Sequence, residues 1–226
     1  MIIITGASRG IGKFLLEHYL NIGEQVIGLY NKTEPSINRE YYYQVDIAND
    51  KAVTEFCRTI EGKLKNVVLI NAAGISYNAF AHKTELEKWR DVIDVNVIGL
   101  FNIISKLLPQ MREEKYGRII NFSSVVAQAG VMGTSAYAAS KSALWGMSKA
   151  IAVENGSKNI TINNITSGYF NIGMIDEVPS GVLDVIIKRI PAGRLGHPQE
   201  LLSTVNFIIN TPYLNGACID LNGGLY

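Results

Sequence analysis

Short apolar runs alternate along the chain with longer segments in which apolar residues recur every three or four positions. Most of the short runs are apolar on both faces, which is typical of parallel strands that are covered on both sides. The longer segments have helical periodicity, as in the stripe formed by Val53, Phe56, Cys57 and Ile60. The runs predict strands at residues 1–5, 25–30, 41–45, 66–70, 117–122, 159–165 and 217–221.

The alternation of strand and helix predicts an α/β fold, because right-handed crossovers place helices on both faces of a parallel sheet. We expect a single domain over residues 1–226, built as a Rossmann-type doubly wound parallel sheet of about seven strands. No internal repeat, linker or low-complexity segment divides the chain. Ligands of such sheets bind beyond the carboxyl ends of the strands, so functional residues are expected in the loops at that edge.

The composition favours a globular protein that acts on a small molecule. Of the 226 residues, 47% are hydrophobic and 18% are charged, and 21 basic residues are scattered among 20 acidic ones for a net charge of +1. This distribution contains no basic stripe that would indicate a nucleic acid or an anionic membrane as partner. The opening "MIIITG" has no basic region or cleavage-like site, and no apolar run looks long enough to span a bilayer, so we expect a cytoplasmic protein.

The two cysteines carry no sign of special chemistry. Cys57 and Cys218 lack metal-ligand spacing, and each is expected to be a small buried hydrophobe rather than a ligand, a nucleophile or a disulfide partner. No metal site is therefore expected.

The first predicted strand runs directly into "TGASRGIG", residues 5–12, and a helix is expected after it. Gly6 permits a sharp turn, Gly10 lets the backbone approach a pyrophosphate, and Gly12 allows close packing of helix against strand. The spacing Gly-x-x-x-Gly-x-Gly departs from the general Gly-x-Gly-x-x-Gly fingerprint, and an ordinary glycine-rich turn is the alternative.

A second motif, "SAYAASK" at residues 135–141, places Tyr137 and Lys141 four positions apart. On a helix, positions i and i+4 share one face, so the phenol and the ammonium can meet. The same spacing also arises by chance, and its meaning depends on the other motifs.

Taken in order, the motifs resemble those of the short-chain dehydrogenase/reductase family in its compact, single-domain form. The resemblance runs from Thr5 to Gly224. Among members of the family, the chain looks most like bacterial 3-oxoacyl-acyl-carrier-protein reductases, although alcohol, sugar and polyketide reductases share most of the motifs. The resemblance rests on "TGASRGIG", "NAAG" at 71–74, Asn96 in "DVNVIG", "NFSS" at 121–124, "YAASK", "GRLGHPQE" at 193–200 and "LNGG" at 221–224.

This resemblance implies a catalytic set of Asn96, Ser124, Tyr137 and Lys141. In the family's scheme, Tyr137 protonates the substrate carbonyl oxygen as hydride arrives from the nicotinamide, and Lys141 holds the nicotinamide ribose. Ser124, thirteen residues before Tyr137, holds the carbonyl oxygen. The asparagine of relatives holds a water that relays protons toward the lysine, and an amide satisfied within the core is the alternative for Asn96. An ammonium beside a phenol should also lower the phenol pKa from its usual value of about 10.

The end of the second strand bears on the type of cofactor. NAD-binding relatives place an acid there, which accepts hydrogen bonds from the ribose 2′-hydroxyl, whereas "LYNKTE" contains no acid before Glu34. Lys32 and Arg9 would attract a 2′-phosphate, so NADP(H) is favoured over NAD(H). The alternative is that Lys32 is an ordinary solvated charge.

Asp46 matches the position that contacts the adenine amino group in relatives. The expected cofactor-binding set is Gly6, Ser8, Arg9, Gly10, Ile11, Gly12, Asn31, Lys32, Asp46, Ile47, Asn71, Ala72, Ala73, Gly74, Tyr137, Lys141, Gly168 and Phe170.

Three stretches depart from relatives. The chain from Asn31 to Asp46 is short, so the helix that is usual there should be reduced or missing. Ser167 replaces a common proline, and Ile172 replaces a threonine whose hydroxyl holds the nicotinamide carboxamide or a phosphate. Residues 168–192 are expected to form a short lid over an apolar substrate, with an ordinary surface helix as the alternative.

The partners follow from the same resemblance. The substrate is a small carbonyl or alcohol, carried as a thioester in the favoured interpretation, with residues 127–134 and Tyr169 lining its pocket. Arg112, Lys115 and Arg118 form either a docking patch for acidic acyl carrier protein or an ordinary solvated helix end. A homo-oligomer, tetramer or dimer, is expected through the helices after residues 84 and 134.

Three functions remain open on the sequence. The favoured one is an NADPH-dependent carbonyl reductase that acts on 3-oxoacyl thioesters. The second is a dehydrogenase of a sugar, a steroid or another secondary alcohol. The third is a nucleotide-sensing or partner-binding protein without turnover, for which Ile172 is the best hint.

Overall fold

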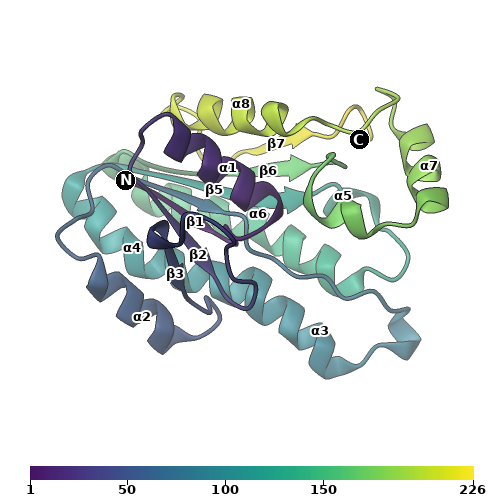
Figure 1. Cartoon of the computed structure of the whole chain (residues 1–226), viewed down its shortest axis with the longest axis horizontal. Helices are drawn as coiled ribbons and strands as arrows, with labels where there is room; N and C mark the ends of the chain where they lie inside the picture. Colours follow the sequence, from purple (N-terminus) through teal and green to yellow (C-terminus); the bar gives the residue numbers. More distant parts are fainter.

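The structure is a computed structural model that describes the backbone of residues 1–226 and all side chains except those of residues 176, 177 and 180. Its seven strands form one sheet in the order β3-β2-β1-β4-β5-β6-β7, and every strand pair is parallel (Figure 1). The sheet confirms the predicted α/β fold, and all seven predicted strands are present. Their bounds are β1 Ile2–Thr5, β2 Val26–Tyr30, β3 Tyr42–Gln44, β4 Val67–Asn71, β5 Gly117–Ser124, β6 Ile160–Ser167 and β7 Cys218–Leu221.

Helices cover both faces of the sheet. Helices α1 and α8 pack on one face, while α2, α4 and α6 pack on the other (Figure 1). Between β2 and β3 there is only the 3-10 turn η1, Arg39–Tyr41, which confirms that the usual helix is reduced. The α-helices are α1 Gly10–Asn21, α2 Asp50–Thr59, α3 Leu86–Ile93, α4 Leu100–Glu114, α5 Val126–Ala129, α6 Ser135–Asn155, α7 Ser180–Arg189 and α8 Pro198–Ile209. The shorter turns are η2 Ala81–Lys83, the π-helical η3 Asp94–Gly99, η4 Gly156–Lys158 and η5 Gly173–Glu177.

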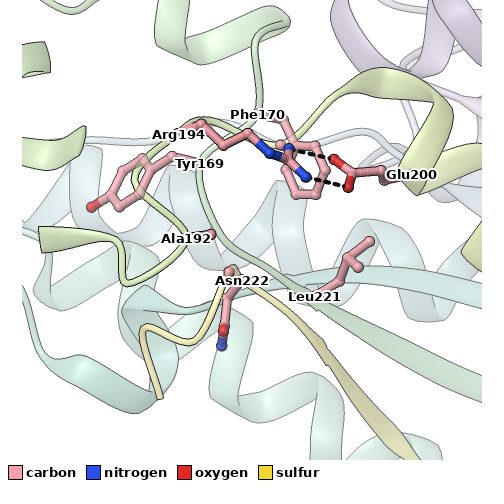
Figure 2. Close-up of a pocket in the computed structure, with 9 residues that line it drawn as sticks. Tyr169, Phe170, Ala192, Arg194, Glu200, Leu221 and Asn222 are labelled. Atoms are coloured by element: carbon pink, nitrogen blue, oxygen red, sulfur yellow. Dashed lines mark hydrogen bonds and ion pairs between the residues drawn. The ribbon is translucent and has the colours of Figure 1, made fainter. Parts of the chain in front are cut away.

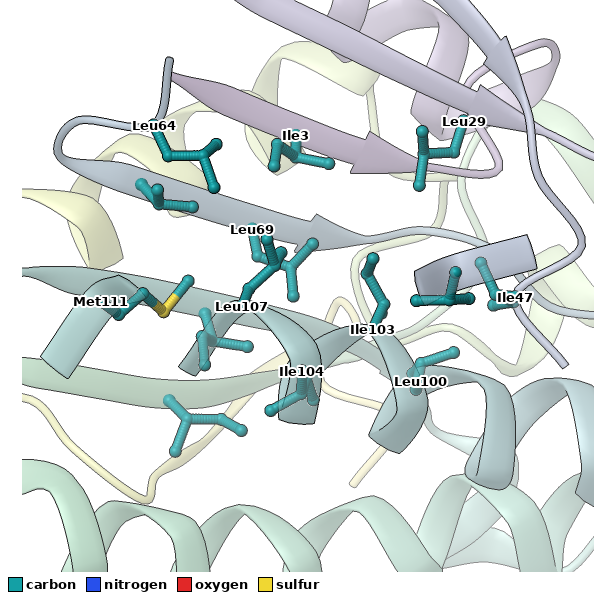
Figure 3. Packing of buried hydrophobic residues seen from close by; sticks show 14 of the residues in the cluster. Ile3, Leu29, Ile47, Leu64, Leu69, Leu100, Ile103, Ile104, Leu107 and Met111 are labelled. Carbon is teal, nitrogen blue, oxygen red and sulfur yellow. The ribbon is translucent and has the colours of Figure 1, made fainter. Parts of the chain in front are cut away.

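Two hydrophobic cores lie on the two faces of the sheet, because successive strand residues point to opposite sides. On β1, Ile3 belongs to the core under α2, α4 and α6, whereas Ile4 belongs to the core under α1 and α8. Figure 3 shows Ile3 and Leu69 facing Leu107 of α4 across the first of these cores. Burying each such aliphatic side chain stabilises the fold by about 1.5–3 kcal/mol. The strands are therefore rich in apolar residues, and this is the pattern that predicted them.

The helix of α3, η3 and α4, Leu86–Glu114, is long and apolar enough to cross a membrane by length and composition. Its apolar side chains at Val92, Leu100 and Leu107 are buried, and those of Leu100 and Leu107 belong to the core under the sheet. The segment therefore packs as a core helix in this fold.

A row of polar residues crosses the sheet on the α6 side. Thr5, Asn71, Asn121 and Asn164 are paired in register on β1, β4, β5 and β6, and all four are fully buried. Each side chain is hydrogen-bonded to that of the next strand, at 3.4 Å from Thr5 to Asn71, 2.9 Å from Asn71 to Asn121 and 3.3 Å from Asn121 to Asn164. This row ties the strands together just before the loops that carry the functional motifs.

The structure corrects the expectation that both cysteines are buried. Cys57 is half-buried, but Cys218 is exposed, because it begins β7, the edge strand of the sheet, where a partner strand covers only one side.

Candidate active site

The glycine-rich turn between β1 and α1 offers bare backbone where a side chain would not fit. Gly6 and Gly10 have φ values of +65° and +54°, and a Cβ on Gly6 would lie 2.6 Å from Ala73 Cα. A Cβ on Gly12 would collide with the Gly6 carbonyl oxygen. Helix α1 begins at Gly10, so its first amides point at this surface. A cradle that a Cβ would fill, at a helix N-terminus, fits the pyrophosphate of a dinucleotide.

Tyr42 supports this turn, although it was not among the predicted site residues. Its hydroxyl donates a 3.2 Å hydrogen bond to the Ala7 carbonyl, and its ring packs edge-on against Tyr30 at the end of β2. The sequence signal was the run "YYYQV", but which tyrosine reaches back to the turn depends on the register of β3.

The residues expected around the adenosine lie at the ends of β2 and β3. The Asn31 carbonyl accepts from Gln44 Nε2 at 3.0 Å, and Lys32 is exposed beside it. Asp46 Oδ1 accepts from the Ala48 amide at 3.0 Å, and the Ile47 carbonyl accepts from Asn102 on α4 at 3.0 Å.

Tyr137, Lys141 and Ser124 meet at the carboxyl end of β5. Tyr137 and Lys141 lie on α6, with Lys141 Nζ 5.6 Å from the centre of the Tyr137 ring. Ser124 ends β5 and is buried, and its hydroxyl is close enough to the Tyr137 phenol to act on the pKa of that phenol. The assignment of Ser124 rather than its neighbour Ser123 is thus consistent with the geometry.

The pKa of Tyr137 differs from the expectation. Burial raises the pKa of this phenol, while the hydrogen bond from Ser124 opposes the rise and the nearby Tyr169 adds to it. The expected net lowering of this pKa is wrong for this structure, because the effect of burial is the largest. The Lys141 ammonium lies over the ring and donates a 2.6 Å hydrogen bond to the Phe122 carbonyl. Burial also lowers the pKa of Lys141 to about 8.

Asn96 lies in the π-helical turn η3, a local widening of the helix that is frequent at functional sites. Its amide donates to the Ile75 carbonyl at 2.9 Å and to Ser140 Oγ at 3.0 Å, and its oxygen accepts from the Ile75 amide at 2.9 Å. Both donors and the oxygen are therefore bonded to protein, which fits the alternative of a satisfied core amide. Asn96 clamps the loop after β4 to α6.

The loop after β4 reaches the catalytic side chains through Gly74. A Cβ on this residue would lie 3.4 Å from Asn96 Oδ1 and 3.5 Å from Lys141 Nζ. On the other side, the Ala73 amide donates to Thr5 Oγ1 at 3.1 Å. The segment Asn71–Gly74 therefore connects the glycine-rich turn with the catalytic helix.

Comparison with known proteins agrees with this architecture. A family model described as "short chain dehydrogenase" matches residues 1–182. The chain belongs to the short-chain dehydrogenase family. It is 36% identical over 234 residues to an acetoacetyl-CoA reductase of Rhizobium meliloti, covering 99% of this chain and 97% of that protein. It is 35% identical over 237 residues to the acetoacetyl-CoA reductase of Shinella zoogloeoides, with the same coverage. It is also 32% identical over 238 residues to a 3-oxoacyl-[acyl-carrier-protein] reductase of Staphylococcus epidermidis, covering 99% and 98%.

Membership confirms the resemblance drawn from the motifs. The chain is an NAD(P)-dependent oxidoreductase that acts on carbonyl or hydroxyl groups, and a nicotinamide cofactor is implied by the family.

The segment after β6 closes against the cofactor side of this short-chain dehydrogenase. A Cβ on Gly168 would lie 2.7 Å from Asn222 Cα, and Phe170 is buried. Ile172 packs against the core under α1 and α8, so the residue in place of the family's threonine serves as an apolar anchor. Next to it, a Cβ on Gly10 would lie 3.1 Å from Gly173 Cα. Gly173, with φ +81°, was not predicted as a site residue, and only the fold brings it to the glycine-rich turn.

The motif "GRLGHPQE" builds a support beside this segment. Arg194 and Glu200 form a two-pronged ion pair with distances of 2.8 Å and 2.9 Å, which Figure 2 shows beside Phe170. This pair, together with the His197 amide, lowers the pKa of Glu200 to about 2. The pair borders a small hollow of about 60 Å³, which the candidate catalytic residues do not line. Its lining is Tyr169, Phe170, Ala192, Arg194, Gly196, Glu200, Leu221, Asn222 and Gly223.

Of the three residues expected either in a docking patch or at a solvated helix end, Arg118 is buried and belongs to neither. Arg118 is only 4% exposed, and its guanidinium donates to the Asn159 and Ile209 carbonyls at 2.8 Å and 3.2 Å. Arg112 donates to Asn155 Oδ1 at 2.6 Å. Both lie near the start of β5, at the opposite edge of the sheet from Ser124. Arg112 and Lys115 are exposed at the end of α4, beside Glu113 and Glu114.

Proposed function

We propose that this short-chain dehydrogenase is an NADPH-dependent reductase of 3-oxoacyl thioesters. The observation that carries the proposal is that Ser124, Tyr137 and the buried Lys141 lie together at the carboxyl end of β5. The names of the similar proteins, acetoacetyl-CoA reductase and 3-oxoacyl-[acyl-carrier-protein] reductase, support a thioester substrate.

The raised pKa of Tyr137 suits a proton donor. A phenol with a raised pKa is fully protonated at neutral pH, so Tyr137 can deliver its proton to a substrate carbonyl oxygen during reduction. Ser124 positions that oxygen through its hydroxyl. Lys141 is still largely cationic at pH 7 with a pKa of about 8, and its charge stabilises the phenolate left behind. The bound nicotinamide would supply the hydride.

The cofactor would be held by main chain at the glycine-rich turn and by side chains at the adenosine end. Gly6, Gly10 and Gly12 provide the pyrophosphate cradle, and Asn71–Gly74 provides a wall beside it. Two features support NADPH. Lys32 is exposed just after β2, and the nearby carboxylate of Glu34 is paired with Arg39 at 3.3 Å, which reduces its repulsion of a 2′-phosphate.

Three further expectations belong to this proposal. Residues 168–192 act as the substrate lid, supported by the half-exposed apolar side chains of Met174, Val182 and Val185. A homo-oligomer is supported by the half-exposed Ile98 and Phe101 on the outer side of η3 and α4. A cytoplasmic location stays a prediction.

The test is NADPH consumption with a panel of 3-oxoacyl thioesters, sugars and simple ketones. Native protein is compared with Tyr137→Phe and with Tyr213→Phe, a matched control at a fully exposed tyrosine. We expect turnover of 3-oxoacyl thioesters that Tyr137→Phe abolishes without loss of NADPH binding.

Two outcomes would contradict the proposal in different ways. Turnover of sugars or simple ketones alone would support the assigned catalytic residues but contradict the assigned substrate class. NADPH binding without any turnover would support a nucleotide-binding protein that does not catalyse.

A further inference from the structure

The two serines that end β5 point in different directions. Strand alternation turns Ser124 toward Tyr137 and turns Ser123 toward the underside of α6. Ser123 is 1% exposed, and its hydroxyl donates to the Lys141 carbonyl at 3.0 Å and accepts from Trp145 Nε1 at 3.0 Å. Its single proton is thus directed at Lys141, and its orientation is fixed by two partners one helical turn apart.

As a result, Lys141 is held at both ends by one dipeptide of β5. Its ammonium donates to the Phe122 carbonyl at 2.6 Å, and its carbonyl accepts from Ser123. Tyr137 lies one turn earlier on the same helix. Since Ser124 is the next residue of the strand, the separation of the Ser124 and Tyr137 hydroxyls depends on how α6 is seated on β5.

A third bond holds Ser123 from the neighbouring strand. Ser167 Oγ donates to the Ser123 carbonyl at 3.0 Å, and the Val125 amide donates to the Ser167 carbonyl at 2.8 Å. These bonds fix the backbone on both sides of Ser124. Ser167, which stood out in the sequence as a departure from the family pattern, therefore has a structural partner at the catalytic strand.

We propose that Ser123 is a positioning residue for carbonyl reduction. Its hydrogen bonds with Lys141 and Trp145 fix the position of α6 against β5, and hence the position of Tyr137 relative to Ser124. The inference rests on the proposed roles of Tyr137 and Ser124. A residue that served packing alone would change the stability of the fold but not the pH dependence of the reaction.

The experiment uses the full-length enzyme with Trp89→Phe as background, so that Trp145 is the only indole. In Ser123→Ala we expect kcat to fall about 10-fold, which corresponds to the loss of a buried hydrogen bond with one donor left unpaired. KM for the ketone should stay within about 2-fold, because substrate binding is untouched. The Trp145 emission maximum should shift, since the indole N–H loses its acceptor.

The pH profile separates positioning from packing. The hydrogen bond from Ser124 lowers the pKa of Tyr137, so a loosened Ser124–Tyr137 contact raises it. The limb of the kcat profile that belongs to Tyr137, above the limb of Lys141 near pH 8, should therefore move to higher pH in Ser123→Ala. Ser123→Thr, which keeps the hydroxyl, should restore the limb and the emission. Ser105→Ala is the matched control, because the Ser105 hydroxyl donates within its own helix, to the Asn102 carbonyl of α4.

The outcomes are distinct. An emission shift with unchanged kcat and pH profile would overturn the proposal, and so would an unchanged emission. If Ser123→Ala does not fold, Trp145→Phe decides: a fall in kcat at constant KM supports the proposal, and native kcat overturns it. Activity retained in Tyr137→Phe would instead defeat the proposed function, while the emission shift in Ser123→Ala would still report the contact.

Discussion

The proposed catalytic half and the proposed nucleotide half of this short-chain dehydrogenase are built in opposite ways. At η3, β5 and α6, polar side chains are buried and bonded to protein: Asn96, Ser123 and Lys141 each have named partners at 3.0 Å or less. At the glycine-rich turn, the surface is bare backbone shaped by Gly6 and Gly10. Proton transfer needs atoms held in fixed places, whereas a pyrophosphate needs a concave surface with amides facing it. Substitutions should therefore act on turnover in one half and on cofactor affinity in the other.

The largest effect should follow from breaking the catalytic half. Lys141→Met keeps the length of the stem but removes the charge that stabilises the phenolate, and kcat should fall by at least about 10²-fold. NADPH affinity should fall much less. Steady-state kinetics measure kcat, and a fluorescence titration measures NADPH affinity. A large loss of both would show that the two halves do not act on separate properties.

The same variant should change how stability depends on pH. The pKa of Lys141 is about 8 in the folded chain, below the ordinary 10.5. The unfolded chain therefore binds more protons between these values, and this residue makes the free energy of unfolding rise with pH from 8 toward 10.5. The full difference is about 3 kcal/mol.

Urea unfolding at about pH 7 and about pH 10 checks the sign. The native protein should gain stability relative to Lys141→Met as the pH rises. Parallel curves for the two proteins would mean that Lys141 is well solvated.

In the nucleotide half, Gly6→Ala should act on binding. The new Cβ would meet Ala73 Cα at a backbone φ of +65°, so we expect about 2 kcal/mol of lost stability and an NADPH Kd raised about 30-fold. Gly62→Ala is a matched control, because its φ is +77° but no atom lies within 4 Å of the added Cβ. Equal losses in the two variants would show that backbone strain, not the cradle, is responsible.

The smallest expected effect concerns the choice of cofactor. Lys32→Ala should raise the Kd of NADPH about 10-fold and leave that of NADH unchanged, because only the former carries the 2′-phosphate. Lys63→Ala, an exposed lysine outside the predicted cofactor set, is the control. The same change for both cofactors would remove Lys32 from the recognition of the phosphate.

The sequence predicted the strands well, because burial on both faces leaves apolar runs. Motif spacing also led to the choice of Ser124 and Tyr137, which the fold brings together at the carboxyl end of β5 and whose catalytic roles stay a prediction. The sequence failed where the property depends on the three-dimensional surroundings. Arg118 is buried against carbonyls from the start of β6 and the end of α8, and the raised pKa of Tyr137 follows from desolvation rather than from its helical neighbour. Likewise, nothing local marks Gly173 as the neighbour of Gly10.

The polar row through Thr5, Asn71, Asn121 and Asn164 has a consequence for how the chain folds. If one strand slipped by a single residue, its asparagine would turn to the opposite face of the sheet, among aliphatic side chains. Each amide stranded there would cost about 1–3 kcal/mol. Apolar strands alone discriminate poorly between neighbouring registers, since both of their faces are hydrophobic. The row therefore disfavours shifted strand registers and selects the one register in which the loops of the candidate active site meet.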